Sequence, residues 1–324
     1  MNPRPRIEPV TWNPPPPSPR TAPSPLSVRT VRLPGTGPED VLVDDDGTVL
    51  TGLVDGRVLR VTPDGRSITT VADTGGRPLG LEWLPDHTLL VCDAERGLLQ
   101  VEADGTVREL VTEADGKRLR FCNNAAVAPD GTVYFTDSSA RFGVQEWKAD
   151  LLEHSATGRL LRRDPDGSVA VLATGLAFPN GVALQPDGRR LVVAEMWTYK
   201  LLTMDLPSGE LTDWVLLPGF ADNISTGSDG LIWVAVASPR DPVVDLLATK
   251  PPVLRKIVWA LPDALQPKPK KLIRIQAYDG EGQVVQDLLG TDQDFHLPTG
   301  VREHHGTVWL GSLERDYLAT FDKL

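Results

Sequence analysis

Two carboxylates and two carboxamides recur at one position of a repeated sequence segment. Each stands eight residues before a Gly that introduces a short apolar run, and the four are Glu39, Asn123, Asn180 and Asp222. Hard oxygen donors without His or Cys suit Ca²⁺ better than Zn²⁺ or copper. Two carboxylates at one place would repel each other unless a cation lay between them. The set therefore predicts a Ca²⁺ site, with a hydrogen-bonded polar plug as the alternative.

The elements that must bring these residues together are short strands repeated along the chain. Six apolar strands begin 40, 44, 57, 42 and 76 residues apart, after Gly47, His87, Gly131, Gly188, Gly230 and Gly306. This period is typical of four-stranded propeller blades, and most copies continue into a second hairpin with an Asp-Gly turn. The sequence therefore predicts an all-β, six-bladed β-propeller in which equivalent positions converge on the axis. Leu79 and Thr299 occupy the axial position of the two remaining blades.

The two ends of the chain are predicted to meet. The last blade is one strand short, whereas SVRTVRL at 27–33 precedes the first blade as a spare strand. We expect this N-terminal strand to close the ring, because closure protects a sheet edge. Residues 1–26 are rich in Pro, which predicts an extended arm ahead of a single propeller domain at 27–324. Between blades 5 and 6, DPVVDLLATKPPVLRKIVWALPDAL predicts a short helical insertion, either a lid or a packing insert.

A second ring of residues is expected where the strand after each turn returns to the same mouth. Its members are candidates for contacts with substrate or for capping of turns: Asp93, Asp137, Glu195 and Ser312. Residues that follow axial positions are expected to orient them through hydrogen bonds, namely Asp40, Asn124 and Asn223, although Asn124 could exchange roles with Asn123. Trp147 and Trp197 flank mouth loops and could contact an apolar substrate, and His154 and His296 lie in segments bordering the mouth.

Composition and charge disfavour several function classes. The 324 residues carry 33 Lys or Arg and 44 Asp or Glu, and this net charge of −11 disfavours binding to a nucleic-acid backbone or an anionic membrane. No stretch approaches the roughly 20 apolar residues of a membrane span, and no signal-peptide pattern is present. We therefore expect a small-molecule substrate and a cytoplasmic location. Cys92 and Cys122 lack metal-site spacing and predict buried thiols, with one disulfide as the alternative.

Four segments together resemble a known family. GPEDVLVDDDG, FCNNAAVAPDGTVYFTDSS, GRLLRRDPDGSVAVLATGLAFPNGVALQPDG and LPGFADNIS look like parts of the strictosidine synthase-like proteins, within the wider group of senescence marker protein/gluconolactonase, paraoxonase and diisopropylfluorophosphatase propellers. The resemblance spans 27–324 and implies a six-bladed propeller with a catalytic axial Ca²⁺. Most metal-dependent members hydrolyse lactones or organophosphate esters. By position, the ligands of the family fall on Glu39, Asn123, Asn180 and Asp222, with Asn223 added in the paraoxonase pattern.

Two departures narrow the chemistry that the resemblance implies. The glutamate that strictosidine synthase uses for condensation is replaced by Thr299, and the paraoxonase histidine pair is replaced by Leu79 and approximately Asp93. The remaining pattern implies a Ca²⁺-dependent hydrolase of lactones or related esters. Asp222 is then the nucleophile or general base, because one carboxylate oxygen can bind metal while the other faces substrate or water. Glu195 or Asp137 is the alternative proton acceptor.

Two other function classes remain open at this point. One is a non-catalytic propeller that binds a small molecule or a protein and uses Ca²⁺ structurally. The other is a condensation enzyme that has lost the synthase glutamate but kept another chemistry. Metal-dependent turnover separates the hydrolase from the binding protein, and the mass of the product separates it from the condensation enzyme.

Overall fold

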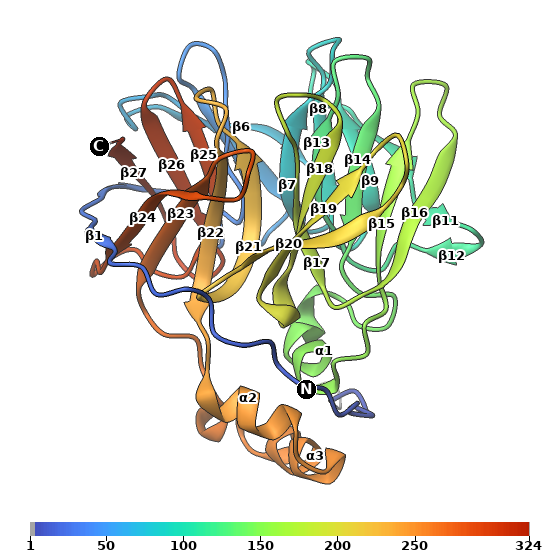
Figure 1. Ribbon diagram of the computed structural model, residues 1–324. Coiled ribbons are helices and arrows are strands. Elements are labelled where there is room, and N and C mark those ends of the chain that lie inside the picture. The colour runs from blue at the N-terminus through green and yellow to red at the C-terminus, as the bar shows by residue number, and fades with distance from the viewer. Residues whose placement is uncertain (1–3, 324) are drawn as a thin grey trace.

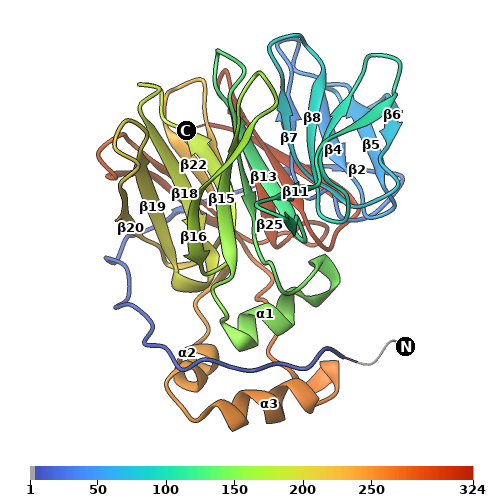
Figure 2. The ribbon, with the colours of Figure 1, turned by 90° about the vertical axis from the view of Figure 1, so that its right-hand side faces the viewer.

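The computed structural model describes residues 4–323, and its strands form six blades around a central axis (Figures 1 and 2). Within each blade, consecutive strands pair antiparallel through short turns. In the turn that follows the first strand of blade 3, Gly131 has a φ of 88° and Asp130 Oδ1 accepts a hydrogen bond from Thr132 N at 2.9 Å. Glycine tolerates this positive φ without a steric penalty. The predicted six-bladed, all-β propeller is confirmed.

The first four blades are built from consecutive strands. Blade 1 contains β3 (Leu42–Val43), β4 (Val49–Gly52), β5 (Arg57–Val61) and β6 (Ile68–Asp73). Blade 2 contains β7 (Pro78–Trp83), β8 (Leu89–Asp93), β9 (Gly97–Val101) and β10 (Val107–Val111). Blade 3 contains β13 (Cys122–Val127), β14 (Val133–Asp137), β15 (Gly158–Arg163) and β16 (Val169–Leu176), and blade 4 contains β17 (Pro179–Leu184), β18 (Arg190–Glu195), β19 (Lys200–Asp205) and β20 (Leu211–Leu216). A hairpin of β11 (Glu113–Ala114) and β12 (Lys117–Arg118) precedes blade 3.

The last two blades incorporate strands from the beginning of the chain. Blade 5 contains β21 (Gly219–Thr226), β22 (Ile232–Pro239), β23 (Ile273–Tyr278) and β24 (Val284–Gly290), and β1 (Ser24–Pro25) adds to its edge in parallel. Blade 6 contains β25 (Pro298–His304), β26 (Thr307–Ser312) and β27 (Tyr317–Asp322). Its fourth strand is β2 (Arg29–Arg32), which pairs antiparallel with β27. The predicted closure of the ring by the N-terminal strand is confirmed.

The hydrophobic core lies between neighbouring blades. One cluster joins Leu42, Leu50 and Val58 of blade 1 to Leu81 and Val91 of blade 2. These residues alternate along their strands with side chains of the opposite face, as β-strand geometry requires. Such sheet-on-sheet packing fixes the angle between blades and therefore the place where each innermost strand begins.

The helices lie at one end of the propeller (Figures 1 and 2). The 3₁₀ turn η1 (Val144–Glu146) and α1 (Trp147–Glu153) connect β14 to β15, and η2 (Met196–Thr198) follows β18. The predicted helical insertion is present as α2 (Pro242–Ala248), α3 (Pro252–Ala260) and η3 (Asp263–Leu265). It lies within blade 5, between β22 and β23, and not between blades 5 and 6 as the sequence suggested. The reason is that β22 and β23 pair with each other, so the chain leaves and re-enters one sheet.

The Pro-rich arm runs along the same end of the molecule before it reaches blade 5 (Figure 2). It can be followed from Arg4, because residues 1–3 of the predicted arm and Leu324 lie outside the described residues. Trp12 N donates to Ala248 O of α2 at 3.2 Å, and Val10 N donates to Glu153 O of α1 at 2.8 Å. Among residues 4–323, no helix is long and apolar enough to cross a membrane.

Candidate functional site

The axial residues converge although they are far apart in the sequence. Five of the six inner strands have an irregular register at the axial residue and the residue after it, for example between Cys122 and Ala125 in β13. A bulge of this kind re-aims side chains. As a result, Asn180 Nδ2 donates to Asp222 Oδ1 at 2.6 Å, and Asn223 Nδ2 donates to Glu39 Oε1 at 3.0 Å across 184 residues. Side chains of blades 1, 4 and 5 are thus in direct contact.

Four buried oxygens of this centre have no hydrogen-bond partner in the described part of the chain. They are Glu39 Oε2, Asn123 Oδ1, Asn180 Oδ1 and Asn223 Oδ1. Leaving one buried acceptor unsatisfied costs about 1–3 kcal/mol, so four at one place need a compensating ligand. All four atoms are hydrogen-bond acceptors with free lone pairs, which a metal cation or a hydrogen-bond donor satisfies and a further acceptor does not. Within residues 4–323 no three His, Cys, Asp or Glu side chains form a metal cluster, so amide oxygens are essential to this set.

A buried hydroxyl determines which way the Asn123 amide points. Ser138 Oγ donates its proton to Pro179 O at 2.7 Å, so it can only accept from Asn123 Nδ2, at 2.8 Å. The Asn123 Oδ1 atom is thereby turned away from Ser138 and stays unpartnered. In the same way, the bond to Asp222 uses Asn180 Nδ2 and leaves Asn180 Oδ1 unpartnered. The surrounding contacts use the amide NH₂ groups and leave the amide oxygens of two residues that line one cavity without partners.

The two carboxyl groups of the centre are both destabilised as anions. Burial raises the pKa of Glu39 well above its ordinary value, and the neighbouring Asp222 and Asp40 raise it further, against the opposing effects of Arg77 and Asn223. Burial also raises the pKa of Asp222 to about 7, although the hydrogen bond from Asn180 opposes this shift. A cation between the two carboxylates would relieve both the desolvation and the repulsion.

The residues that follow the axial positions join neighbouring blades. Asp40 Oδ2 accepts from Leu81 N at 3.1 Å and from Asn124 Nδ2 at 3.4 Å, and Asn124 Oδ1 accepts from Val182 N at 3.1 Å. We call Glu39, Asn123, Asn180, Asp222 and Asn223 the oxygen cluster. Among the three residues expected to orient axial ones, only Asn223 hydrogen-bonds to an axial residue of another blade, namely Glu39. Asp40 and Asn124 therefore tie blades 1 to 4 together beneath the axial ring.

A cavity of about 290 Å³ opens above the oxygen cluster. Glu39, Asn123, Asn180, Asp222 and Thr299 line its polar floor. Both tryptophans that were expected at the mouth line its walls, Trp147 from α1 and Trp197 from η2. The lining is predominantly apolar and aromatic, so the cavity fits a small molecule with an apolar body and one polar group at the floor.

Most of the cavity wall consists of residues that were not predicted from the sequence. The residues two positions before the axial ones in blades 2 to 6 all line it: Arg77, Phe121, Phe178, Phe220 and Leu297. Phe178 packs between Phe121 and Trp197, with ring centroids 5.1 and 4.4 Å away. The same counting of repeat positions that selects the axial residues would have found this ring. Arg77 is its one charged member, and its guanidinium is almost fully buried.

Four predicted mouth residues have their side chains engaged in capping and lie outside the cavity lining. Asp93 Oδ1 accepts from three backbone N–H groups, and Glu195 Oε1 accepts from Ala177 N at 2.9 Å. Ser312 Oγ donates to His296 O at 2.7 Å. Asp137 accepts from Phe121 N at 2.8 Å and pairs with Arg159 Nη2 at 2.6 Å. The capping interpretation therefore describes these side chains better than contact with substrate.

His154 also lies outside the cavity lining, because it stacks on Trp12 of the arm with ring centroids 4.0 Å apart. Burial lowers its pKa to about 4, so the imidazole is neutral near pH 7. His154 caps the C-terminus of α1 in a left-handed conformation, with a φ of 55°. Its contact with Trp12 holds the arm against the helix that supplies Trp147 to the cavity.

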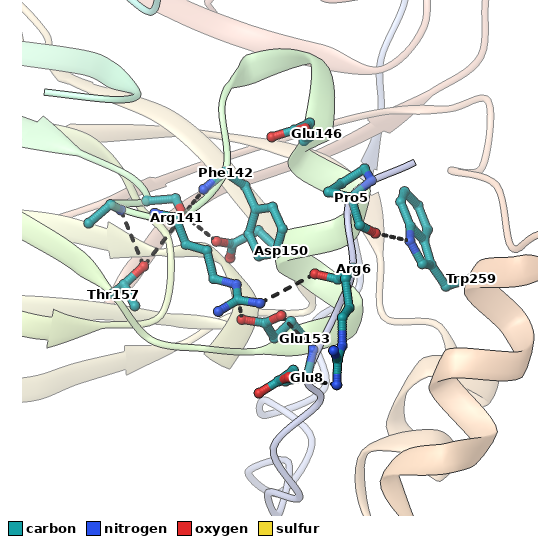
Figure 3. A network of polar contacts seen from close by, with 12 residues as sticks. Pro5, Arg6, Glu8, Arg141, Phe142, Glu146, Asp150, Glu153, Thr157 and Trp259 are labelled. Atoms are coloured by element: carbon teal, nitrogen blue, oxygen red, sulfur yellow. Dashed lines mark hydrogen bonds and ion pairs between the residues drawn. The ribbon is translucent and has the colours of Figure 1, made fainter. Parts of the chain in front are cut away.

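A network of polar contacts with the arm and with neighbouring residues holds α1 in place (Figure 3). Glu153 accepts from Glu8 N of the arm at 2.7 Å and pairs with Arg141 Nε at 2.8 Å. Asp150 accepts from the Ser139 hydroxyl and from Trp197 Nε1 at 2.8 Å, and its burial raises its pKa to about 6. Two aromatic walls of the cavity thus depend on contacts made by one short helix.

Comparison with known proteins places the chain in a family. A strictosidine synthase family model matches residues 123–203, and a model for the N-terminal region of strictosidine synthase-like proteins matches residues 26–61. The chain is 34% identical over 297 residues to protein strictosidine synthase-like 6 of Arabidopsis thaliana, with 89% of this chain and 79% of that protein covered. It is 33% identical over 325 residues to the adipocyte plasma membrane-associated protein of Salmo salar, with 88% and 75% covered.

Solved structures agree on the fold. A gluconolactonase from Xanthomonas campestris superposes with a TM-score of 0.68 at 19% identity, covering 91% of this chain and 89% of that one. The calcium-binding protein regucalcin from Agrobacterium tumefaciens gives a TM-score of 0.63 at 14% identity, covering 91% and 96%. The sequence relatives decide the narrower assignment, and this chain belongs to the strictosidine synthase-like family.

Proposed function

We propose that this protein is a Ca²⁺-dependent hydrolase of lactones or related esters with an apolar body. The observation that carries the proposal is the set of unpartnered oxygens of Glu39, Asn123 and Asn180 on the floor of an apolar cavity. A fourth unpartnered oxygen belongs to Asn223, which hydrogen-bonds to Glu39. The fold neighbours named as a gluconolactonase and as a calcium-binding protein support the choice of reaction and ion.

In this proposal the ligands of the ion are the residues of the oxygen cluster: Glu39, Asn123, Asn180, Asp222 and Asn223. When bound, the ion supplies polarisation of the substrate carbonyl oxygen and stabilises the negative charge that develops there. The chain itself supplies the orientation of the ligands. Asn223 holds one oxygen of Glu39 and leaves Oε2 free to bind the ion. Asn180 fixes Oδ1 of Asp222, the oxygen that would bind the ion, and leaves Oδ2 for the reaction.

Asp222 is the proposed nucleophile or general base. Its Oδ1 accepts from Asn180, while Oδ2 forms no hydrogen bond with residues 4–323 and the residue lines the cavity. As a base, Oδ2 would accept a proton from the attacking water. As a nucleophile, Oδ2 would attack the carbonyl carbon and form a mixed anhydride while the ester oxygen leaves and takes a proton from water, and a second water would then cleave the anhydride. Label found in Asp222 after hydrolysis in oxygen-18 water identifies the nucleophile, because a general base never forms a bond to the water oxygen.

The cavity walls favour a substrate with an apolar body. Phe121, Phe178 and Phe220 surround the space above the cluster, with Trp147 and Trp197 nearer the helices. These rings exclude water from the reacting carbonyl, which strengthens electrostatic interactions at the floor. A γ- or δ-lactone that carries an aromatic or branched aliphatic substituent matches this shape better than a sugar lactone, whose hydroxyl groups would find few partners on the walls.

The test is hydrolysis of a panel of aliphatic, aromatic and sugar lactones, with Ca²⁺ and with a chelator. We expect turnover of substituted apolar lactones that is lost on chelation and recovered when Ca²⁺ is restored. A protein that retains Ca²⁺ but hydrolyses no lactone or ester contradicts the proposal and favours a binding protein. A product heavier than the substrate, formed in the presence of an amine, would instead indicate condensation.

Replacing Ser138 with alanine is expected to weaken Ca²⁺ binding by about 10–100-fold, the usual cost of losing a residue that orients a ligand. Without the hydroxyl, the Asn123 amide is free to rotate and present its NH₂ group to the ion. Isothermal titration calorimetry measures the change. The matched control is Ser312→Ala, since Ser312 is also fully buried near the mouth and donates to a backbone carbonyl but contacts no residue of the cluster. Equal losses in the two variants would contradict the orienting role.

A further inference from the structure

The helical insertion exposes an unusual number of aliphatic side chains. Six of the eleven large hydrophobic residues that are exposed within residues 4–323 lie on α2, α3 and η3. They form what we name the α2–α3 patch: Val243, Leu246, Val253, Leu254, Ile257 and Leu265. Isolated exposed aliphatic residues are ordinary in globular proteins, but a concentration on one projecting element marks a surface that contacts something.

In α3 a charged side chain is buried against the protein, whereas aliphatic side chains are exposed. Its arginine, Arg255, is only 2% exposed, whereas Val253 and Ile257 are 56% and 53% exposed. The buried face is firmly attached, because Arg255 donates to Val10 O at 2.7 Å and Leu152 O at 3.2 Å, and Trp259 Nε1 donates to Pro5 O at 2.8 Å. Figure 3 shows the hydrogen bond from Trp259 to Pro5 of the arm. The helix is therefore held so that its aliphatic face points away from the molecule.

The charge of the insertion is opposite to that of the chain. Residues 240–271 contain seven Lys or Arg and three Asp, a formal charge of +4, in a protein with a net charge of −11. Lys250 and Lys256 are exposed within the helical segment, and Lys268, Lys270 and Lys271 are exposed on its return to β23. The lysine ion pairs among residues 4–323 involve Lys200 and Lys323, so these five ammonium groups are available to an external anion.

The patch lies beside the cavity mouth. On α2, Val244 lines the cavity while Val243 and Leu246 are exposed on other sides of the same helix. The return segment does the same, because Lys268 lines the cavity edge. Figures 1 and 2 show α2 and α3 projecting beyond the blades at this end of the propeller. Whatever covers the patch therefore also faces the entrance to the apolar cavity.

We propose that the α2–α3 patch docks the protein on an anionic lipid bilayer, with the cavity mouth towards the membrane. Aliphatic side chains flanked by lysines are the composition of helices that lie in the bilayer interface, where the side chains enter the acyl region and the ammonium groups contact lipid phosphates. An apolar substrate dissolved in the bilayer could then enter the cavity without crossing water. The net charge of the chain argues against this partner, but the Debye length of about 8–10 Å makes the local charge decisive at a contact.

The test is flotation with vesicles of phosphatidylcholine alone and of phosphatidylcholine with phosphatidylserine, using the full chain in the presence of a chelator. We expect binding to the mixed vesicles, weaker binding to phosphatidylcholine, and partial release by high salt. Val253→Ser with Ile257→Ser should lower partitioning by at least about tenfold, because two exposed aliphatic groups no longer enter the bilayer. Lys250→Glu with Lys256→Glu should remove the preference for phosphatidylserine.

The matched control is Val284→Ser with Val285→Ser, which removes two exposed valines from the edge of blade 5, on β24. This variant should float as the wild type does. The proposal is overturned if the wild type does not float with mixed vesicles, if binding requires Ca²⁺, or if the control loses as much binding as the patch variant. A dimer in light scattering that Val253→Ser with Ile257→Ser dissociates would also overturn it, because the patch would then be covered by a second copy. None of these outcomes depends on lactone hydrolysis.

Discussion

Replacing Asp222 with alanine is expected to reduce kcat/KM for lactone hydrolysis by at least about 10³-fold, since the variant loses a proposed ligand and the proposed nucleophile or base together. The side chain lies on the cavity floor, where Asn180 fixes one of its oxygens. Asp222→Asn keeps the shape but not the charge and should show a similar loss. Initial rates at saturating Ca²⁺ measure both variants.

The same substitution is expected to stabilise the folded protein when Ca²⁺ is absent. The pKa of Asp222 rises from its ordinary value of 3.8 to about 7 in the folded protein, so the folded state binds the proton more tightly than the unfolded state does. Stability therefore falls as the pH rises from about 4 through 7, and it stays reduced above that pH. Removing the carboxyl abolishes this penalty and also lowers the pKa of Glu39, which the Asp222 charge raises.

In a chelator at about pH 8, Asp222→Ala should thus melt at a higher temperature than the wild type, and with Ca²⁺ the order should reverse. A hydrogen-bonded plug without a metal predicts the contrary result, because its removal would destabilise the protein in both conditions. Glu195→Gln is the matched carboxylate control, because Glu195 caps Ala177 N and lies outside the cavity lining. It should alter kcat/KM by no more than about threefold.

The propeller could be predicted because its determinants are local and repeated. Every blade contains one apolar strand at the same place in the repeat, blades 1 to 5 also contain an Asp-Gly turn, and the count of six needs only the spacing of the apolar strands. Closure by β2 follows from a spare strand at one end and a missing strand at the other. The position of α2 and α3 within blade 5 could not be predicted from these spacings, because in the sequence a strand that follows an insertion looks like the start of a new blade.

The residues on the floor of the site could also be predicted by counting positions in the repeat. The directions in which side chains point could not. Glu39, Asn123, Asn180 and Asp222 share a register position, and the ring geometry brings equal positions together. Asp137 and Glu195 also share a position with each other, yet they turn back to cap the backbone ahead of their blades. A carboxylate at the end of a strand can point either way, and only the positions of nearby N–H groups and of Arg159 decide between capping and catalysis.

Replacing Arg159 with methionine is expected to lower the free energy of unfolding by about 3–5 kcal/mol, the usual cost of breaking a buried ion pair on one side. The Arg159 side chain is 5% exposed and that of Asp137 is fully buried. The guanidinium also donates to Ala114 O at 3.1 Å, which attaches the β11–β12 hairpin to blade 3. Urea unfolding measures the loss. The matched control is Arg162→Met on the same strand, whose ion pair with Asp164 is partly exposed and should contribute less than about 1 kcal/mol.

The loss of stability in Arg159→Met should depend on pH and on the charge of Asp137. Burial raises the pKa of Asp137, and the Arg159 hydrogen bond and charge lower it, so removing Arg159 raises that pKa further. The unpaired carboxyl then takes up a proton as the pH falls, and the deficit of Arg159→Met should be smaller at about pH 5 than at about pH 8. For the same reason, Asp137→Asn added to Arg159→Met should recover part of the stability.

That double variant also decides the role of Asp137. If the carboxyl only caps Phe121 N and pairs with Arg159, the folded double variant keeps lactone hydrolysis within a few-fold of the wild type. If Asp137 were the proton acceptor, as the sequence allowed, activity would fall by about 10²–10⁴-fold while the protein remained folded. Circular dichroism and the unfolding midpoint establish the folded state before rates are compared. A folded but inactive double variant would move the proton acceptor from the cavity floor at Asp222 to the wall behind Phe121.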